Sequence, residues 1–465
     1  LSTGKFQMEI TQNYFLWSNF RFFYFSFISI YKKNYRFFVK FNPYIHLYSL
    51  NIKMNKKIKD IFIKNFTNLS LNQGINILIA IIVTPILFQN LGSSQFGLVN
   101  LAFSIFMLIS ICVSYGYHLN GPKRISLINN IDQERDLISE LISLRFFIAV
   151  IVSLLIVLIT LLTSLFNNYE LIILCSIPIL FSEAIHPVFY LQGKNNLSVL
   201  AILNAFSKLI YLGLIVISIK NPDDAFKVNL FYGATILFVY LVYWIKFFHS
   251  NKIQFLCSSF KKITIRLKDN FQFFFSSIAG HISIHSGLII LKLFTNNNEL
   301  GKFALASRVA LLLRMIPVFI IQSVLQNASV INKNNSSDLN QYLNYYYSRG
   351  LFVTFIIGVF FTLFSKWIII LFSGEEITYS NQILSLLSFI PFLAMLNFKN
   401  ILLILVNEKK RILNKATWIS AFFMICIATI LSYYYKGLGL AIALLFSEFI
   451  SFIIHSILLS NSNES

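Results

Sequence analysis

Charge is scarce in this chain: Asp, Glu, Lys and Arg make up 12% of it, and only 18 residues are acidic against 38 basic ones. A soluble domain carries about 25% charged residues, so the composition excludes a set of ordinary soluble domains. Hydrophobic residues reach 57% and stand in runs of about twenty, the length that crosses a bilayer as a helix. These features predict an all-α, polytopic membrane protein.

Cysteine is also scarce, and the four thiols are scattered in apolar surroundings. They form no CxxC pair and no Cys/His spacing, so we expect neither a metal site nor a disulfide. The nucleotide-binding patterns GxxxxGK[ST] and GxGxxG after a strand are missing, as is the metalloprotease pattern HExxH. We therefore expect no cofactor, and an ATP-driven pump is disfavoured.

The loops between the apolar runs are short and basic. None exceeds about two dozen residues, which leaves no room for a soluble catalytic domain, so we expect no enzyme. The net charge of +20 is spread over these loops rather than gathered in one basic domain, so nucleic acid is not an expected partner. Most loop Lys and Arg residues lie on one side, whereas the other side holds Lys220, Lys227, Lys302 and Lys436. The positive-inside rule then places both termini in the cytoplasm.

About twelve apolar spans are predicted after the first 53 residues, six in each half of the chain. They cover residues 66–90, 96–118, 141–166, 170–192, 196–220, 226–248, 270–295, 301–326, 347–373, 381–407, 411–435 and 437–460. The halves resemble each other, since Gly97-Leu-Val-Asn-Leu-Ala102 opens span two and Gly301-Lys-Phe-Ala-Leu-Ala306 opens span eight. Because six is even, both halves enter the membrane from the same side as a parallel repeat. We expect two six-helix lobes, residues 54–255 and 256–465.

Residues 1–53 differ from the rest of the chain. They are crowded with Phe and Tyr, mixed with Lys and Arg, and contain no clean span. Met54-Asn-Lys-Lys-Ile-Lys59 has the form of a conventional start of a bacterial membrane protein, so we interpret residues 1–53 as a non-native extension. An interfacial amphipathic segment is the alternative.

Four cations stand well inside apolar spans: Lys208, Arg308, Arg314 and Lys399. A charge at the centre of a membrane helix costs about 2.5–3.5 kcal/mol on the insertion scale, and charges kept there are normally functional. Arg also suits bidentate contact with phosphate or carboxylate. We predict that the four line a shared cavity for an anionic substrate. An ion pair of an arginine with Glu183 or Glu448 is the structural alternative.

Further polar residues inside the spans complete the candidate site. Glu183 and Glu448 can serve as counter-ions of the cations or as sites of ion coupling. His281 and His285, one helical turn apart, can titrate near neutral pH or simply form hydrogen bonds between helices. The asparagines predicted to line the cavity are Asn72, Asn76 and Asn204, with packing between helices as the alternative for the first two.

Proline is rare, but five prolines stand within the predicted spans: Pro85, Pro178, Pro187, Pro317 and Pro391. Proline removes a backbone hydrogen bond and kinks a helix, so we expect these spans to bend. Paired bends in spans four and ten fit helices that flex during alternating access.

Several short motifs cluster in the first half of the chain. They are Asn72-Gln-Gly-Ile-Asn76, Pro85, Leu91-Gly92 with Phe96-Gly97, Tyr115-Gly116 before a basic loop, and Gln192-Gly-Lys194. This set resembles the Wzx-type polysaccharide flippases of the multidrug/oligosaccharidyl-lipid/polysaccharide exporter superfamily. The resemblance implies two lobes around a central cationic cavity in the bacterial inner membrane. It also implies movement of an undecaprenyl-diphosphate-linked oligosaccharide to the outer leaflet for O-antigen, capsule or exopolysaccharide synthesis, with a polysaccharide polymerase and a chain-length protein as partners.

Three other functions stay open at this point. A drug or cation exporter of the same superfamily would place carboxylates, rather than Lys and Arg, around its substrate. A lipid II flippase differs only in its cargo. A polysaccharide polymerase typically needs a large external loop or clustered carboxylates, and the outer loops offer only Asp223-Asp224 and Glu375-Glu376.

Overall fold

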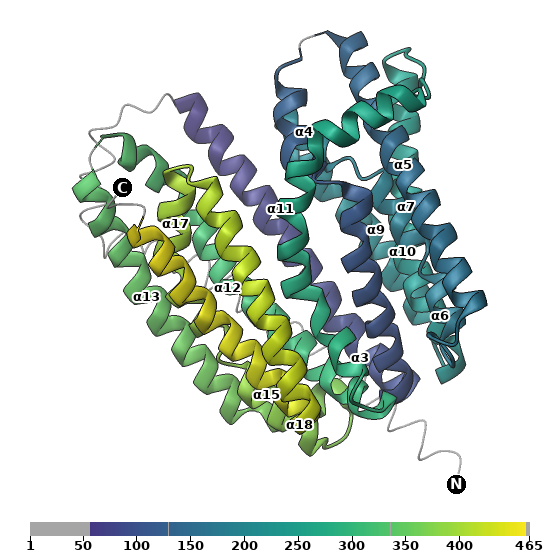
Figure 1. The fold of residues 1–465 in the computed structure, drawn as a ribbon, viewed down its shortest axis with the longest axis vertical. Coiled ribbons are helices and arrows are strands. Elements are labelled where there is room, and N and C mark those ends of the chain that lie inside the picture. Colours follow the sequence, from purple (N-terminus) through teal and green to yellow (C-terminus); the bar gives the residue numbers. More distant parts are fainter. Residues whose placement is uncertain (1–55, 129, 335, 462–465) are drawn as a thin grey trace, which may run out of the picture. The chain divides into compact units, whose positions relative to one another are not determined.

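The computed structural model describes residues 56–128, 130–334 and 336–461, and nearly all of them are helical (Figure 1). Side chains are described from residue 74 onward, apart from residues 326, 327, 330 and 333–338. The chain divides into two units, residues 1–64 and 65–465. Within the first unit only the beginning of one helix is described, so the interpretation of residues 1–53 falls outside the described residues.

The helices vary from six residues to more than fifty. In chain order they are α3 (Lys56–Ser114), α4 (Tyr117–Ser126), α5 (Ile131–Leu162), α6 (Glu170–Cys175), α7 (Pro178–Ala184), α8 (Val188–Gly193), α9 (Leu197–Ser218), the 3₁₀ turn η1 (Pro222–Asp224), α10 (Ala225–Ser250), α11 (Phe260–Lys292), α12 (Asn297–Asn334), α13 (Ser336–Leu363), α14 (Ser365–Ser373), α15 (Thr378–Leu387), α16 (Ile390–Leu396), α17 (Phe398–Val406) and α18 (Lys410–Asn461). No strand occurs among the described residues.

Ten segments of the described chain are long and apolar enough to cross a membrane. Two of them, Gly74–Ser126 and Lys410–Asn461, contain 53 and 52 residues. At 1.5 Å per residue each would be about 80 Å long as one helix, far beyond a hydrocarbon core of about 30 Å. Each also contains a residue with non-helical backbone angles: Gly92 (φ 72°, ψ 167°) and Lys436 (φ 52°, ψ −130°).

The chain turns back on itself at both of these residues. A Cβ atom added to Gly439 would lie 1.9 Å from the carbonyl oxygen of Leu431, and the ring centroids of Phe88 and Phe96 are 5.2 Å apart. Eight residues of continuous helix would separate such pairs by about 12 Å. Each long segment is therefore an antiparallel pair of spans, and the predicted all-α polytopic fold is confirmed.

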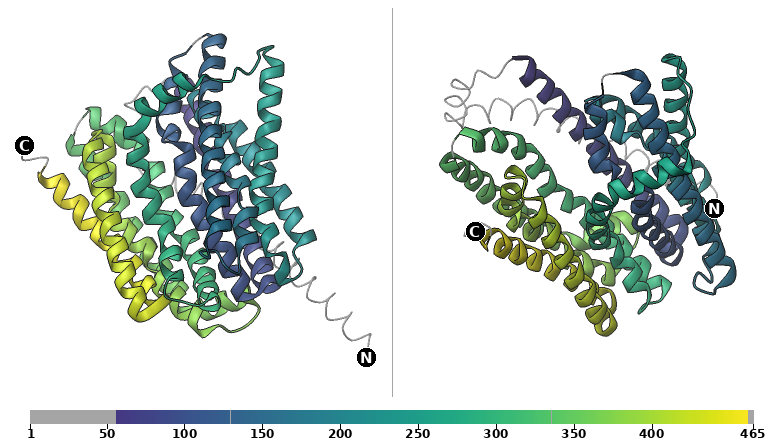
Figure 2. Two further views of the ribbon diagram at one scale, coloured as in Figure 1. Left: turned by 45° about the vertical axis from the view of Figure 1, so that its right-hand side comes forward. Right: turned by 45° about the horizontal axis from the view of Figure 1, so that its top comes forward.

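The helices of residues 65–465 form two groups (Figures 1 and 2). In the first group α10 packs against α6, α7 and α9, and α4 packs against α8. In the second group α12 packs against α13, α15, α16 and α17, while α18 packs against α15, α16 and α17. Helix α11 lies between the groups (Figure 1), because it packs along α18 and also contacts α4 and α5.

The first part of α11 is tied to the first group by hydrogen bonds. The hydroxyl of Tyr117 donates to the carbonyl oxygen of Arg266 at 3.0 Å, and Asn120 Nδ2 donates to Asn270 Oδ1 at 2.8 Å. The second predicted lobe, residues 256–465, therefore begins with a helix whose first part is attached to the other group. The lobe boundary itself stays a prediction.

The two repeated motifs meet each other in the fold. A Cβ on Gly97 would lie 2.6 Å from the amide nitrogen of Gly301, and a Cβ on Gly301 would lie 1.7 Å from the carbonyl oxygen of Ser93. The hydroxyl of Ser93 also donates to Asn298 Oδ1 at 2.6 Å. Only glycine allows two helix backbones to approach so closely, and this contact joins equivalent positions of the two halves.

The prolines predicted bends in spans four and ten, and the structure divides both spans into short helices. Span four consists of α6, α7 and α8, with Pro178 at the start of α7 and Pro187 just before α8. Span ten consists of α15, α16 and α17, with Pro391 in the first turn of α16. By contrast, α3 and α12 continue as helices through Pro85 and Pro317.

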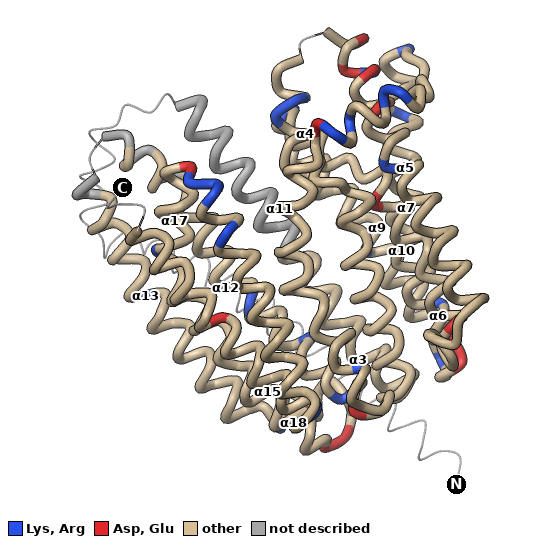
Figure 3. The backbone as a smooth tube through the Cα atoms, viewed as in Figure 1, with Lys and Arg blue, Asp and Glu red and all other residues tan. Residues whose placement is uncertain are grey.

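Lys and Arg gather near the ends of the helices and are sparse along their middles (Figure 3). We call the end that holds α4, the start of α5 and the start of α18 the basic end. The turns at Gly92 and Lys436 lie at the opposite end. A few charges remain between these ends, and they belong to the cavity described next.

Candidate functional site

A cavity of about 780 Å³ is bordered by helices of both groups. Helices α3, α7, α9 and α10 contribute to its wall from the first half, and α11, α12 and α18 contribute from the second. The predicted site residues that line it are Asn76, Glu183, Asn204, Lys208, His285, Arg308, Arg314 and Glu448. The fold thus brings together residues that are up to 372 positions apart in the sequence.

Two predicted site residues lie outside this lining, and one is not described. The ammonium of Lys399 stands 4.4 Å from the ring centroid of Tyr347, in a cation–π contact between α17 and α13. His281 Nδ1 lies 3.1 Å from the carbonyl oxygen of Ser277 on its own helix. The side chain of Asn72 falls outside the described residues.

Arg308 is half-buried in the cavity wall and is held by neutral groups. Its Nε donates to Asn100 Oδ1 at 2.7 Å, and its Nη1 donates to the hydroxyl of Thr84 at 3.4 Å. The guanidinium carbon also lies 5.5 Å from the ring centroid of Phe96. All three partners come from the antiparallel pair of spans in α3, so this helix orients the arginine without neutralising its charge.

Lys208 is also half-buried, and its closest described partners are aromatic rings. Its Nζ lies 3.5 Å from the ring centroid of Tyr232 and 5.9 Å from that of Tyr211. These two rings contact each other edge to face at 5.6 Å. Among the described residues, Lys208 and Arg308 form no ion pair, so this part of the cavity carries two uncompensated positive charges.

Arg314 differs, because it forms an ion pair with Glu448. The distance from Arg314 Nη2 to Glu448 Oε1 is 2.5 Å. The ion pair weighed as the structural alternative is therefore present for Arg314. The pair links α12 to α18, and both side chains line the cavity.

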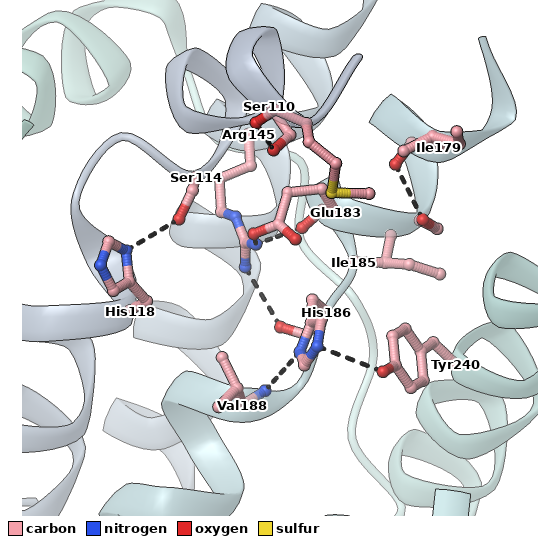
Figure 4. A network of polar contacts seen from close by, with 12 residues as sticks. Ser110, Ser114, His118, Arg145, Ile179, Glu183, Ile185, His186, Val188 and Tyr240 are labelled. Carbon is pink, nitrogen blue, oxygen red and sulfur yellow. Dashed lines mark hydrogen bonds and ion pairs between the residues drawn. The ribbon is translucent and has the colours of Figure 1, made fainter. Parts of the chain in front are cut away.

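Glu183 pairs with an arginine that the sequence did not single out (Figure 4). Arg145 belongs by sequence to the basic side of the loops, but in the structure its side chain is only 2% exposed and its Nη2 lies 3.0 Å from Glu183 Oε1. Its Nη1 donates to the carbonyl oxygen of His186 at 3.2 Å, and Nη2 also contacts the carbonyl oxygen of Glu183. In a continuous helix the carbonyl oxygen of Glu183 would accept from the amide of residue 187, but Pro187 has no N–H. Arg145 therefore supplies a donor at the break in span four.

His186 stands at the same break and also lines the cavity (Figure 4). The amide of Val188 donates to His186 Nδ1 at 3.1 Å, so a neutral imidazole carries its proton on Nε2. That nitrogen lies 3.2 Å from the hydroxyl oxygen of Tyr240, which donates in turn to Asn204 Oδ1 at 2.6 Å. Asn204, predicted to line the cavity, is therefore connected to His186 by a series of hydrogen bonds through Tyr240. The signal in the sequence was a histidine directly before a proline inside an apolar span.

The break in span ten has a similar partner from another helix. Asn397, between α16 and α17, lies with its Nδ2 3.3 Å from His455 Nδ1. That nitrogen is also 2.7 Å from the carbonyl oxygen of Ser451. His455, which belongs to α18, lines the cavity, so an imidazole lies in the cavity wall beside each broken span. Sequence reasoning missed both histidines because each acquires its setting only through tertiary contacts.

Comparisons with known proteins agree with this arrangement. The sequence profile of the polysaccharide biosynthesis protein family matches residues 62–326, more than half of the chain. A protein of Shigella dysenteriae that is provisionally named an O-antigen transporter is 25% identical over 403 residues, which cover 83% of this chain and 96% of that protein. One of Escherichia coli strain K12 with the same provisional name is 24% identical over 402 residues, which cover 83% and 93%.

Solved structures show the same fold at low sequence identity. The lipid II flippase MurJ, in an inward closed conformation, has a TM-score of 0.67 at 16% identity and covers 84% of this chain and 87% of its own. An inward-facing MATE family multidrug resistance transporter has a TM-score of 0.67 at 14% identity and covers 86% and 99%. The family match extends from span one through span eight, and it includes the helices that hold Lys208 and Arg308. The chain therefore belongs to the polysaccharide biosynthesis protein family.

Proposed function

We propose that this protein is a flippase of the bacterial inner membrane. It moves an undecaprenyl-diphosphate-linked oligosaccharide from the cytoplasmic to the outer leaflet, for the synthesis of a surface polysaccharide such as O-antigen. The provisional names of its relatives support this cargo. The observation that carries the proposal is the pair of cavity cations, Lys208 and Arg308, which form no ion pair with a carboxylate among the described residues.

These two cations are arranged to receive an anion. A diphosphate offers several negatively charged oxygens, and the planar guanidinium of arginine matches such oxygens with paired N–H groups. Asn100 and Thr84 hold Arg308 as neutral acceptors, and an anionic oxygen forms a stronger hydrogen bond than either. The ring of Tyr232 holds the Lys208 ammonium in the same way. Binding of the diphosphate therefore replaces weak partners and breaks no ion pair.

Export of a cationic drug is less compatible with this cavity. Such a substrate requires a carboxylate that is free to receive a positive charge. Both predicted carboxylates of the cavity are occupied, since Glu183 is paired with Arg145 and Glu448 with Arg314. The charge balance of the described lining thus favours an anionic substrate.

Orientation and partners follow from the same proposal. The basic end faces the cytoplasm by the positive-inside rule, and both termini lie on that side. The chain moves its substrate without changing a covalent bond, so it is not an enzyme. A polysaccharide polymerase and a chain-length protein act on the repeat units after they reach the outer leaflet.

Deletion of the gene in the source bacterium tests the function. Loss of the surface polysaccharide is expected, together with accumulation of lipid-linked repeat units that stay inaccessible from outside. The wild-type chain should restore the polysaccharide, whereas Lys208→Gln at equal protein level should not. An unchanged surface polymer in the deletion strain contradicts the proposal.

A further inference from the structure

We propose that the Arg314–Glu448 pair and the hydroxyl groups beside it form a subsite for the sugar that is attached to the diphosphate. The inference rests on the proposed function and assigns two parts of the substrate to two parts of the cavity. A diphosphate needs hydrogen-bond donors and positive charge. A sugar ring needs donors and acceptors side by side, because each hydroxyl both donates and accepts.

The ion pair provides both kinds of group in one place. The side chains of Arg314 and Glu448 are 33% and 16% exposed, so a ligand in the cavity can reach them. Among the described residues, neither side chain forms a hydrogen bond or ion pair with any residue other than its partner. The second oxygen of the carboxylate is therefore left to accept, and the remaining N–H groups of the guanidinium are left to donate.

Hydroxyl groups line the same cavity from the two antiparallel legs of α18. Ser447 and Ser451 line the cavity on the same leg as Glu448, one residue before it and three after it. Ser420 lines the cavity from the other leg. The number of residues from Ser420 to the turn at Lys436 is nearly the same as the number from that turn to Ser451. Because the two legs are antiparallel, the two serines lie at a similar depth.

Ser420 adds an unsatisfied group to this wall. Its Oγ is buried and has no hydrogen-bond partner among the described residues. A buried polar atom without a partner is costly, and in native structures nearly every such atom has a hydrogen-bond partner. A sugar hydroxyl is a partner of suitable chemistry, because it can donate to this oxygen or accept from it.

Electrostatics separates this wall from the diphosphate site. The Arg314–Glu448 pair has no net charge, and its carboxylate repels phosphate oxygens, whereas Lys208 and Arg308 together carry two positive charges. Arg308 and Arg314 stand six residues apart on α12, which separates their Cα atoms by about 9 Å along the helix. A diphosphate at Arg308 therefore places an attached saccharide within reach of Arg314 and Glu448.

Binding measurements on the purified full chain in lipid nanodiscs test the assignment. The probes are undecaprenyl diphosphate and the same lipid carrying glucose, galactose or N-acetylglucosamine. We expect the wild type to bind at least one sugar-bearing lipid about tenfold more tightly than the unsubstituted lipid, a difference of about 1.4 kcal/mol. The double variant R314Q/E448Q should lose this preference while it still binds the unsubstituted lipid. K208Q should weaken the binding of every probe by a similar factor.

The double variant is preferred to either single one, because removing one partner leaves an unpaired charge inside the protein. Ser420→Ala is a second, milder variant, expected to reduce the sugar preference in part. Lys399→Gln, outside the cavity lining, is the matched control and should bind all probes as the wild type does.

Three results overturn the proposal. They are an equal loss of affinity for all probes in R314Q/E448Q, full retention of the sugar preference in that variant, and a wild type without any sugar preference. A wild type that binds none of the four lipids contradicts the proposed function instead, so the two failures are distinguishable.

Discussion

The arginines beside the cavity differ in what holds them. Arg145 and Arg314 are bound by carboxylates, whereas Arg308 is bound by an amide and a hydroxyl. A carboxylate competes with an anionic ligand for the guanidinium, but a neutral acceptor does so only weakly. At the scale of single residues, the group that holds each arginine therefore decides whether its positive charge is available to an anion.

Neutralising Lys208 or Arg308 should reduce transport. Hydrogen bonds to charged groups contribute about 1.5–3 kcal/mol, so Lys208→Gln and Arg308→Gln should each lower export about tenfold or more. The measurement is the amount of surface polysaccharide at matched levels of membrane-inserted protein. Lys399→Gln should export normally, because its ammonium contacts Tyr347 outside the cavity lining. Full export by both cavity variants would show that the two charges are not needed.

Arg145 should matter for stability rather than for substrate. Arg145→Met leaves the Glu183 carboxylate, which is 25% exposed at the cavity wall, without its partner. Breaking a fully buried pair costs about 3–5 kcal/mol, and we expect a smaller loss of stability here. We expect a lower unfolding temperature for the purified protein in detergent. Adding Glu183→Gln removes the unpaired charge, so R145M/E183Q should be more stable than R145M alone. Equal stability of these two variants contradicts this role.

At the scale of helices, the sequence predicted the spans well, because length and hydrophobicity are local properties. It also predicted that proline would bend spans four and ten, and the structure breaks both into short helices. It could not tell that α12 continues through Pro317 while span four breaks at Pro187, because the outcome depends on neighbouring donors. Arg145 supplies one such donor, and Trp244 Nε1 supplies another to the carbonyl of Ile185 at 2.7 Å.

The contact between Gly97 and Gly301 should be sensitive to a single methyl group. Gly301→Ala places its Cβ 1.7 Å from the carbonyl oxygen of Ser93, so the two helices must separate. We expect slower cross-linking of Ser93→Cys with Asn298→Cys by a short thiol-reactive linker, in a chain whose native cysteines are replaced. Gly213→Ala, where nothing lies within 4 Å, should cross-link like the parent. A rate unchanged by Gly301→Ala contradicts the close approach.

At the scale of the whole molecule, the repeat predicted two halves, and helix packing shows two groups with α11 between them. The sequence could not predict how α11 attaches, because its position in the repeat places it in the second half. Its contacts are decided by Tyr117 and Asn120, which reach it from the first half. The cavity residues follow the same pattern. The sequence suggested an ion pair of an arginine with Glu183 or Glu448 as an alternative, but it could not tell that Arg145 would pair with Glu183 while Arg308 stayed without a carboxylate partner.

The proposed orientation gives a direct topological prediction. Alkaline phosphatase, which is active only outside the cytoplasm, should be active when fused after Asn221 and inactive when fused after Asn195 or Ser465. The reason is that Lys194 belongs to the strongly basic side, whereas the loop at Asn221 belongs to the side with few cations. Activity in the opposite pattern would invert the proposed direction of transport.

The contact between Gly97 and Gly301 also limits which substitutions the protein can accept at these two positions. Each of the other nineteen amino acids carries a Cβ atom, so any amino-acid change at Gly97 or Gly301 inserts at least one atom where a backbone already lies. Neither position has to touch the cargo for this to hold. In a scan of all single substitutions, these two positions should therefore be among the least tolerant, because any replacement forces the two helices apart.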